Sequence, residues 1–175
     1  MPVPIDVSLH ALNAKSLLAL LFIGVLPLLV ALRMAIWMNE GRPLKAATLL
    51  VITTVALIAG LGMWQLVSVR MRVDASSLTV GGGFYRVSVP LDRLGRGAQI
   101  ERVRRYALGA RTNGIGMPGL LLGWFDISGG GRAFVAITDA DKVVTIPTQD
   151  GYTIFVSPDD PDALVEMLRH RPQPG

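Results

Sequence analysis

Two long apolar runs near the N-terminus constrain this chain more than any other feature of its sequence. The first covers residues 16–38 and contains Arg33 as its only charge, and the second covers residues 46–69 without a charge. At about 1.5 Å per residue, each run is long enough to cross a hydrocarbon core of about 30 Å. The sequence therefore predicts two transmembrane helices, over about residues 16–38 and 45–67, after an N-terminal tail over residues 1–15.

The segment between the two runs, residues 39–45, breaks the helix and cannot remain in lipid. Gly41 and Pro43 disfavour a helix, and the charged side chains around them are costly in hydrocarbon. We therefore expect a tight transmembrane hairpin, in a multi-pass integral protein of the cell membrane, with both termini on one side. Trp37 and Trp64 fall at opposite ends of this hairpin, where interfacial aromatic residues are enriched.

Four residues within the runs refine this prediction. Pro27 predicts a local kink rather than a helix end, because a neighbouring helix can satisfy the carbonyl group that a proline frees in lipid. Ala56 and Gly60 form a small-xxx-small step through which the helices can approach closely, and Gln65 marks the exit of the second run. A secretory signal peptide is the alternative for the first run, but a second apolar run follows it directly.

The basic residues that set membrane orientation nearly balance. On the side of the loop lie Arg33, Arg42 and Lys45. On the opposite side lie Lys15, Arg70, Arg72 and Arg86. This margin favours both termini, and with them the C-terminal domain, in the cytoplasm.

The composition agrees with one small domain attached to a membrane element. Of 175 residues, 51% are apolar, and the mean hydropathy of +0.47 is too high for an ordinary soluble domain of this size. The length allows one compact domain with a membrane element and excludes a large multidomain enzyme. The chain has no cysteine, so disulfides, thiolate nucleophiles and cysteine-ligated metals are excluded. A formal charge of +4 is a mild excess for a membrane protein, and we do not expect nucleic-acid binding.

After Arg70 the apolar residues alternate with a period of two, which is typical of half-buried strands. Short turns rich in Gly and Asp separate these strands, so we expect an antiparallel meander rather than an α/β nucleotide fold. The segment 90–111 is less regular and should contain a short strand or helix. The expected strands are 67–73, 78–80, 84–89, 121–128, 132–138, 142–147 and 152–157.

A helix should close the chain. Asp160 is a suitable N-cap, Pro161 fits the first helical position, and Asp162 lies near the positive end of the helix dipole. Leu164 and Leu168, with Met167, share one face, so the helix should lay an apolar stripe across the open end of the strands.

The stretch from Thr112 to Ser157 carries a resemblance to a known family. It contains TNGIGMPG, then GWF at residues 123–125, then AFVAITD, VVTIPT, and GY, with SP before the final helix. In order and spacing these motifs resemble the bacterial pleckstrin-homology (PH) domain family. The resemblance implies an α+β protein with a PH-like β-barrel or sandwich over residues 70–175, capped by the C-terminal helix and associated with a membrane.

Two motifs bear on phosphoinositide and nucleotide binding, and both argue against it. Phosphoinositide-binding PH domains generally carry basic residues in the turn between their first two strands, whereas residues 74–77 read DASS, so headgroup recognition by this turn is not expected. Gly114, Gly116 and Gly119 spell G-x-G-x-x-G, but Pro118 interrupts the motif and a strand follows it. These glycines are expected in an ordered loop, not at a nucleotide.

One basic cluster and one aromatic are the candidate binding residues. The cluster comprises Arg102, Arg104, Arg105 and Arg111, with Asn113 beyond it. It could bind anionic lipid headgroups, each base contributing about 1 kcal/mol near an anionic surface, or it could be a solvated face paired with local acids. Trp124 precedes Phe125, so the two point to opposite faces of a strand, one toward the core and the other half exposed or anchoring a partner.

Catalytic residues are few. His10 and His170 lie at the two ends of the chain, away from any triad or metal pattern, and adjacent Asp159 and Asp160 are better explained by helix capping. We expect no enzyme activity, no metal and no cofactor.

These patterns predict a membrane-anchored, non-catalytic PH-like binding or scaffold module. Besides the bilayer, its partner would be an anionic lipid headgroup, a membrane protein or a second copy of the chain. The alternatives are a structural subunit of a membrane complex and, less favoured, a membrane-bound hydrolase or transferase.

Overall fold

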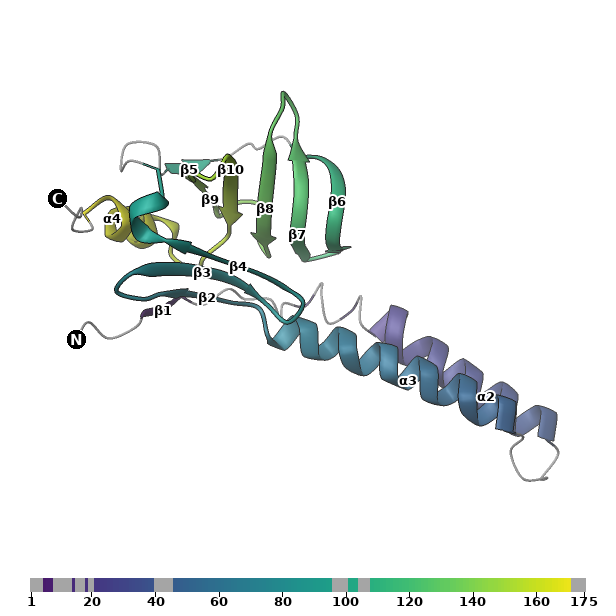
Figure 1. Cartoon of the computed structure of the whole chain (residues 1–175). Coiled ribbons are helices and arrows are strands. Elements are labelled where there is room, and N and C mark those ends of the chain that lie inside the picture. The colour runs from purple at the N-terminus through teal and green to yellow at the C-terminus, as the bar shows by residue number, and fades with distance from the viewer. Residues whose placement is uncertain are drawn as a thin grey trace.

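The computed structural model describes residues 5–7, 14, 18, 21–39, 46–95, 101–103 and 108–170 (Figure 1). The helical elements are the π-helix η1 (Leu21–Val25), α2 (Leu26–Asn39), α3 (Ala46–Val67), the 3₁₀ helix η2 (Leu91–Arg93) and α4 (Pro161–Arg169). The strands are β1 (Ile5–Val7), β2 (Arg70–Val73), β3 (Ser77–Gly82), β4 (Tyr85–Pro90), β5 (Glu101–Val103), β6 (Leu108–Met117), β7 (Leu120–Ile127), β8 (Arg132–Ile137), β9 (Val143–Pro147) and β10 (Tyr152–Val156). We call the two sheets together with α4 the β domain.

Helices α2 and α3 lie side by side and extend away from the β domain (Figure 1). In the described part of the chain, α3 is the one helix that is long and apolar enough to cross a membrane, over Leu49–Val67. Only 11% of that window is buried inside the structure. Leu50 is 68% exposed and Ile58 is 65% exposed, so the apolar surface of α3 lies mostly outside the fold.

The irregularity that Pro27 predicts takes the form of a π-helical turn. Pro27 has no N–H group, and its ring crowds the carbonyl group four residues earlier, in Ile23. The wider π-helix over Leu21–Val25 lies at this position, and helix α2 continues after it.

The close approach between the helices involves different residues from those predicted. Gly24 is buried, and a Cβ atom built on it would lie 3.3 Å from the Cβ atom of Ala59. By contrast, a Cβ atom on Gly60 would meet nothing within 4 Å, and Ala56 is exposed. The predicted step at Ala56 and Gly60 is therefore wrong as the contact between these helices, because the rotation of α3 turns Ala59 toward η1.

The β domain consists of two sheets packed over one core. The first is antiparallel, in the order β1-β2-β3-β4, and the second has the order β5-β9-β10-β8-β7-β6. Side chains from both sheets and from α4 meet in a main core, in which Phe134 is the largest fully buried side chain. This α+β arrangement, with a C-terminal helix, agrees with the predicted class. The N-terminal tail also contributes, because β1 pairs with β2 through Ile5 opposite Val73.

The predicted meander is wrong in its last three strands. Strand β10 lies between β8 and β9, antiparallel to β9 and parallel to β8, with Tyr152 opposite Arg132. The connection from β8 to β9 therefore passes over the position that β10 occupies. Alternation of apolar residues shows which face of a strand is buried but not which strand lies beside it.

The loop expected around the glycine motif is also wrong. Gly114 and Gly116 lie within β6, paired with β7, and Gly114 faces Gly123 across the pair. A Cβ atom on Gly114 would overlap the carbonyl oxygen of Leu122, so these glycines allow two strands to approach closely. Gly119, with φ of 82°, makes the turn between them.

Of the predicted alternatives, a barrel or a sandwich, the described strands form an open sandwich. Strands β5 and β6 occupy opposite edges of the six-stranded sheet. These two edge strands are not paired with each other, so the sheet does not close.

The six-stranded sheet buries side chains on both faces. Trp124 packs on the main core, whereas its neighbour Phe125 points to the opposite face, as the alternation predicts. Phe125 belongs there to a second cluster with Ala133, Val135, Ile137, Val143 and Phe155.

The C-terminal helix forms as predicted. The Asp160 side chain accepts a hydrogen bond of 3.0 Å from the backbone N–H of Ala163, and Pro161 occupies the first turn. Leu164 and Leu168 are buried in the main core, and Met167 packs partly against it.

Removing this cap provides a first test. We expect Asp160→Ala to lower the free energy of unfolding by about 1 kcal/mol, because one N–H group of the first turn loses its acceptor. Asp160→Ser keeps an acceptor and should remain within a few tenths of a kcal/mol of the wild type. Thermal unfolding in detergent measures both, and equal losses in the two variants would contradict a capping role.

Candidate functional site

The end of helix α3 is built into the β domain. Leu66 is 1% exposed and belongs to the main core, and Gln65 is 2% exposed. The Gln65 side chain donates from Nε2 to the carbonyl oxygen of Gly82 at 2.6 Å and accepts from the N–H of Phe84 at 2.9 Å. Two hydrogen bonds thus fasten the helix to the β3–β4 turn. The sequence marked Gln65 only as an exit from lipid and did not predict this contact.

The consecutive glycines in this turn permit the contact. A Cβ atom on Gly82 would overlap the carbonyl oxygen of Ser68, and one on Gly83 would overlap the side-chain oxygen of Gln65. Gly83 also has φ of 58°, which favours glycine. Three glycines exceed what a short hairpin turn needs, and this excess was the sequence signal for a close approach.

An exposed aromatic pair lies beside this junction. The rings of Trp64 and Phe84 meet edge to face, with centroids 5.3 Å apart. Phe84 is 69% exposed at the tip of the β3–β4 turn. Trp37, near the far end of α2, is also exposed, so the two tryptophans lie at opposite ends of the helical pair, as the sequence predicts.

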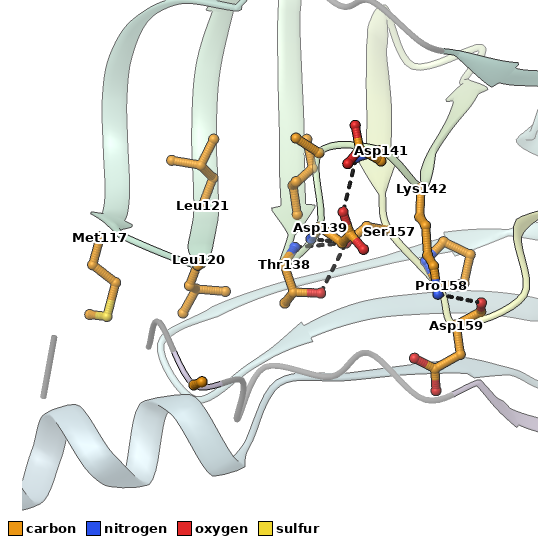
Figure 2. A pocket seen from close by; sticks show the side chains of 14 residues that line it. Met117, Leu120, Leu121, Thr138, Asp139, Asp141, Lys142, Ser157, Pro158 and Asp159 are labelled. Atoms are coloured by element: carbon orange, nitrogen blue, oxygen red, sulfur yellow. Dashed lines mark hydrogen bonds between the residues drawn. The ribbon is translucent and has the colours of Figure 1, made fainter. Parts of the chain in front are cut away.

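A pocket of about 970 Å³ lies at one end of the six-stranded sheet (Figure 2). Met117, Leu120 and Leu121, from the β6–β7 region, form its apolar side. The opposite side comes from the β8–β9 and β10–α4 connections, through Thr138, Asp139, Asp141, Lys142, Ser157, Pro158 and Asp159.

The polar groups of this pocket hold its loops together. The Ser157 hydroxyl oxygen accepts from the N–H groups of Thr138, at 2.7 Å, and Asp139, at 3.1 Å. Asp139 Oδ1 accepts from the N–H of Asp141, and Lys142 Nζ donates to the Asp159 carbonyl oxygen. These bonds account for the positions of the Ser157, Asp139 and Lys142 side chains. Among the described residues, no group of three or more His, Asp or Glu side chains is placed to hold a metal ion.

The predicted arginine cluster is only partly within the described structure. Arg102 lies in β5, and Arg111 lies exposed in β6, at opposite edges of the six-stranded sheet. Arg104 and Arg105 lie outside the described residues. The described part of the chain therefore does not show Arg102 and Arg111 as one patch.

Asn113 and Trp124 do come together, with partners that the sequence missed. They are opposite each other in the β6–β7 pair, and Asn113 Oδ1 accepts from the Tyr85 hydroxyl at 3.2 Å. The Trp124 ring lies 5.1 Å from the Tyr152 ring, and the Arg132 guanidinium lies 4.9 Å from its centroid. These contacts join five strands, so strand order was needed to find them.

Tyr152 is the one described group at this cluster with a shifted pKa. Partial burial raises the pKa of the Tyr152 phenol above its ordinary value of 10.0, and the nearby Asp150 carboxylate adds to the rise. The phenol therefore stays protonated to a higher pH than an ordinary tyrosine does.

Comparison with known proteins agrees with the fold. The family model described as Bacterial PH domain matches residues 69–172, which is more than half of the chain. The match begins two residues after α3 ends and includes α4. No curated protein and no solved structure matches the chain. PH domains are generally non-catalytic binding modules. With two packed sheets, a C-terminal helix and this match, the chain belongs to the bacterial PH domain family.

Proposed function

We propose that this protein is a membrane-anchored, non-catalytic binding module, with α2 and α3 as a transmembrane hairpin and the PH domain at the bilayer surface. One observation carries the proposal: the apolar helix α3 enters the core of the domain through Gln65 and Leu66 without an intervening linker. A ligand of the domain is therefore held at a fixed distance from the bilayer.

The exposed surface of the helices supports the bilayer as their environment. Burying a leucine or isoleucine side chain is worth about 1.5–3 kcal/mol, and α3 leaves many such side chains outside the fold. The apolar window of 19 residues rises about 28 Å, close to the thickness of the hydrocarbon core. The continuous helical stretch Leu21–Asn39 lies along α3 and has a similar length, which supports a second span.

In this assignment residues 16–69 form the membrane part and residues 70–175 form the PH domain. The tail, residues 1–15, returns to the domain through β1. The pocket of Figure 2 and the Trp124 cluster are the surfaces that we propose for partners. The pocket combines an apolar wall with three aspartates and one lysine, Lys142, and this acidic excess suits a protein segment that carries apolar and basic side chains.

Membrane insertion and orientation can be tested together on the full chain. We expect the protein to stay in vesicles washed with alkaline carbonate, because two apolar helices hold it in lipid. A fluorescent protein fused to the C-terminus should fluoresce, and alkaline phosphatase fused there should be inactive, if the domain lies in the cytoplasm. Release by carbonate would refute the membrane anchor, and the opposite reporter pattern would refute the orientation.

A structural subunit of a membrane complex is the second candidate. Ala56 and Gly60 leave a step of small residues on α3 that the described residues do not cover, and such steps commonly pack against another helix. Crosslinking in native membranes distinguishes the candidates. A discrete heteromeric adduct through α3 would favour the subunit, whereas a monomer or homo-oligomer would favour the binding module.

A further inference from the structure

The outer face of the four-stranded sheet carries a row of arginines that the sequence analysis used only to judge orientation. In the register of β2, β3 and β4, Gly81 lies between Arg70 and Arg86. Arg72 lies in the next row on β2, opposite Thr79. Alternation along each strand places these residues on the face turned away from the main core, where Arg70, Arg72 and Arg86 are all exposed.

These residues line a cleft of about 560 Å³, which we call the arginine cleft. Its lining consists of Trp64, Val67, Ser68, Arg70, Arg72, Asp74, Thr79, Gly81 and Arg86. Gly81 adds no side chain between the two arginines, and a Cβ atom built on it would overlap the carbonyl oxygen of Tyr85. Three arginines against one aspartate give the lining a net positive charge.

Arg70 and Arg86 have no acidic partner in the described part of the chain. A guanidinium group that makes no ion pair retains its donors for an anion, and it can bind phosphate oxygens in a bidentate manner. The free donors of two arginines on either side of Gly81 therefore favour a phosphate group as the ligand.

The arginine cleft lies at the depth of lipid headgroups if α3 crosses the bilayer. Val67 ends both the apolar window and α3, and it also lines the cleft. Arg70 follows three residues later, at most about 10 Å of extended chain. The headgroup layer beyond a hydrocarbon core extends over about 5–8 Å on each side. Trp64 lies one helical turn inside, where interfacial tryptophans are enriched.

We propose that the arginine cleft binds the phosphate group of an anionic phospholipid in the leaflet next to the PH domain. This inference rests on the proposed membrane anchor. The site lies on β2 and β4, apart from the turn at residues 74–77 and from Arg102 and Arg111. Binding at this site holds the domain to a specific class of lipid, in addition to the anchoring by the helices.

Lipid titration of the full-length protein tests this proposal. The protein in dodecyl maltoside micelles is titrated with phosphatidylglycerol or phosphatidylcholine, and native mass spectrometry gives an apparent Kd for each lipid. We expect the wild type to prefer phosphatidylglycerol. Arg70→Gln/Arg86→Gln should weaken phosphatidylglycerol binding about 25-fold and leave phosphatidylcholine binding unchanged, because each of the two bases near an anionic surface contributes a factor of about five.

A double variant with the same change in charge provides the control. Arg93, in η2, forms an exposed ion pair with Asp150, and Arg169 ends α4, which lies on the side of the β domain away from α2 and α3 (Figure 1). Arg93→Gln/Arg169→Gln should keep the wild-type preference. A similar loss in both double variants would show a general charge effect and overturn the site, as would retained preference in Arg70→Gln/Arg86→Gln. Thermal unfolding of all variants verifies that they are folded.

A soluble phosphate is the other source of the same chemistry. Isothermal titration with glycerol 3-phosphate addresses it, in wild type and in Arg70→Gln/Arg86→Gln. Binding that depends on these arginines, without a preference for phosphatidylglycerol, would overturn the lipid in favour of a soluble phosphate. Retention in carbonate-washed vesicles together with failure of the lipid test would refute the cleft while leaving the membrane anchor intact.

Discussion

Gly82→Ala should lower the melting temperature of the PH domain by roughly 15 °C, for a loss of about 3 kcal/mol in the free energy of unfolding. The added methyl group would overlap the carbonyl oxygen of Ser68, which belongs to the backbone at the end of α3. The turn cannot easily move away, because Gln65 bonds to both Gly82 and Phe84. Gly82 does not have a positive φ, so the expected loss comes from the clash and not from backbone strain.

Thermal unfolding of the full chain in detergent, followed by circular dichroism, measures this effect. Gly60→Ala is the matched control, because a Cβ atom there meets nothing within 4 Å and alanine is favoured within a helix. We expect its melting temperature to equal or exceed that of the wild type. An unchanged melting temperature for Gly82→Ala would show that the turn can move from the helix and that the junction is not tightly packed.

Gln65→Leu should also cost about 3 kcal/mol, since it leaves the Gly82 carbonyl and the Phe84 N–H without partners in a buried or partly buried site. The two side chains are similar in volume, so the loss reports hydrogen bonds rather than a cavity. Gln149→Leu is the control, because Gln149 makes an exposed hydrogen bond to the Asp92 carbonyl oxygen and should lose less than about 0.5 kcal/mol. Equal losses in the two variants would contradict a special role for Gln65.

Gln65→Leu also tests whether the junction fixes the orientation of the domain relative to α3. The chain has no cysteine, so spin labels can be placed on single introduced cysteines at Leu57 in α3 and Ser88 in β4. We expect a narrow distance distribution in the wild type and a broader one after Gln65→Leu. Because Gly82 and Gln65 act at one contact, the double variant should lose less than the sum of the two single variants.

Local signals in the sequence were sufficient wherever neighbouring residues supply the physical cause. Helix α3 follows from an uncharged apolar run, α4 from the cap at Asp160, and the opposite faces of Trp124 and Phe125 from strand alternation. The family resemblance over residues 112–157 also agrees with the match over residues 69–172.

Predictions failed where the answer depended on partners distant in the chain. The place of β10 between β8 and β9 depends on strand pairing, and the contact of Gly24 with Ala59 depends on the rotation of a helix. The arginine cleft requires β2, β3 and β4 in register before Arg70 and Arg86 lie across Gly81. No spacing along the chain contains that information.

The sequence by itself thus determined an apolar helix followed by half-buried strands and a capped terminal helix, because each depends on periodicity, charge and capping within a few residues. Only the tertiary structure decided that Gln65 fastens this helix to the β3–β4 turn and that Gly82 and Gly83 admit the contact. A side chain on α3 finds its hydrogen-bond partners only after the strands have paired and brought the turn to it.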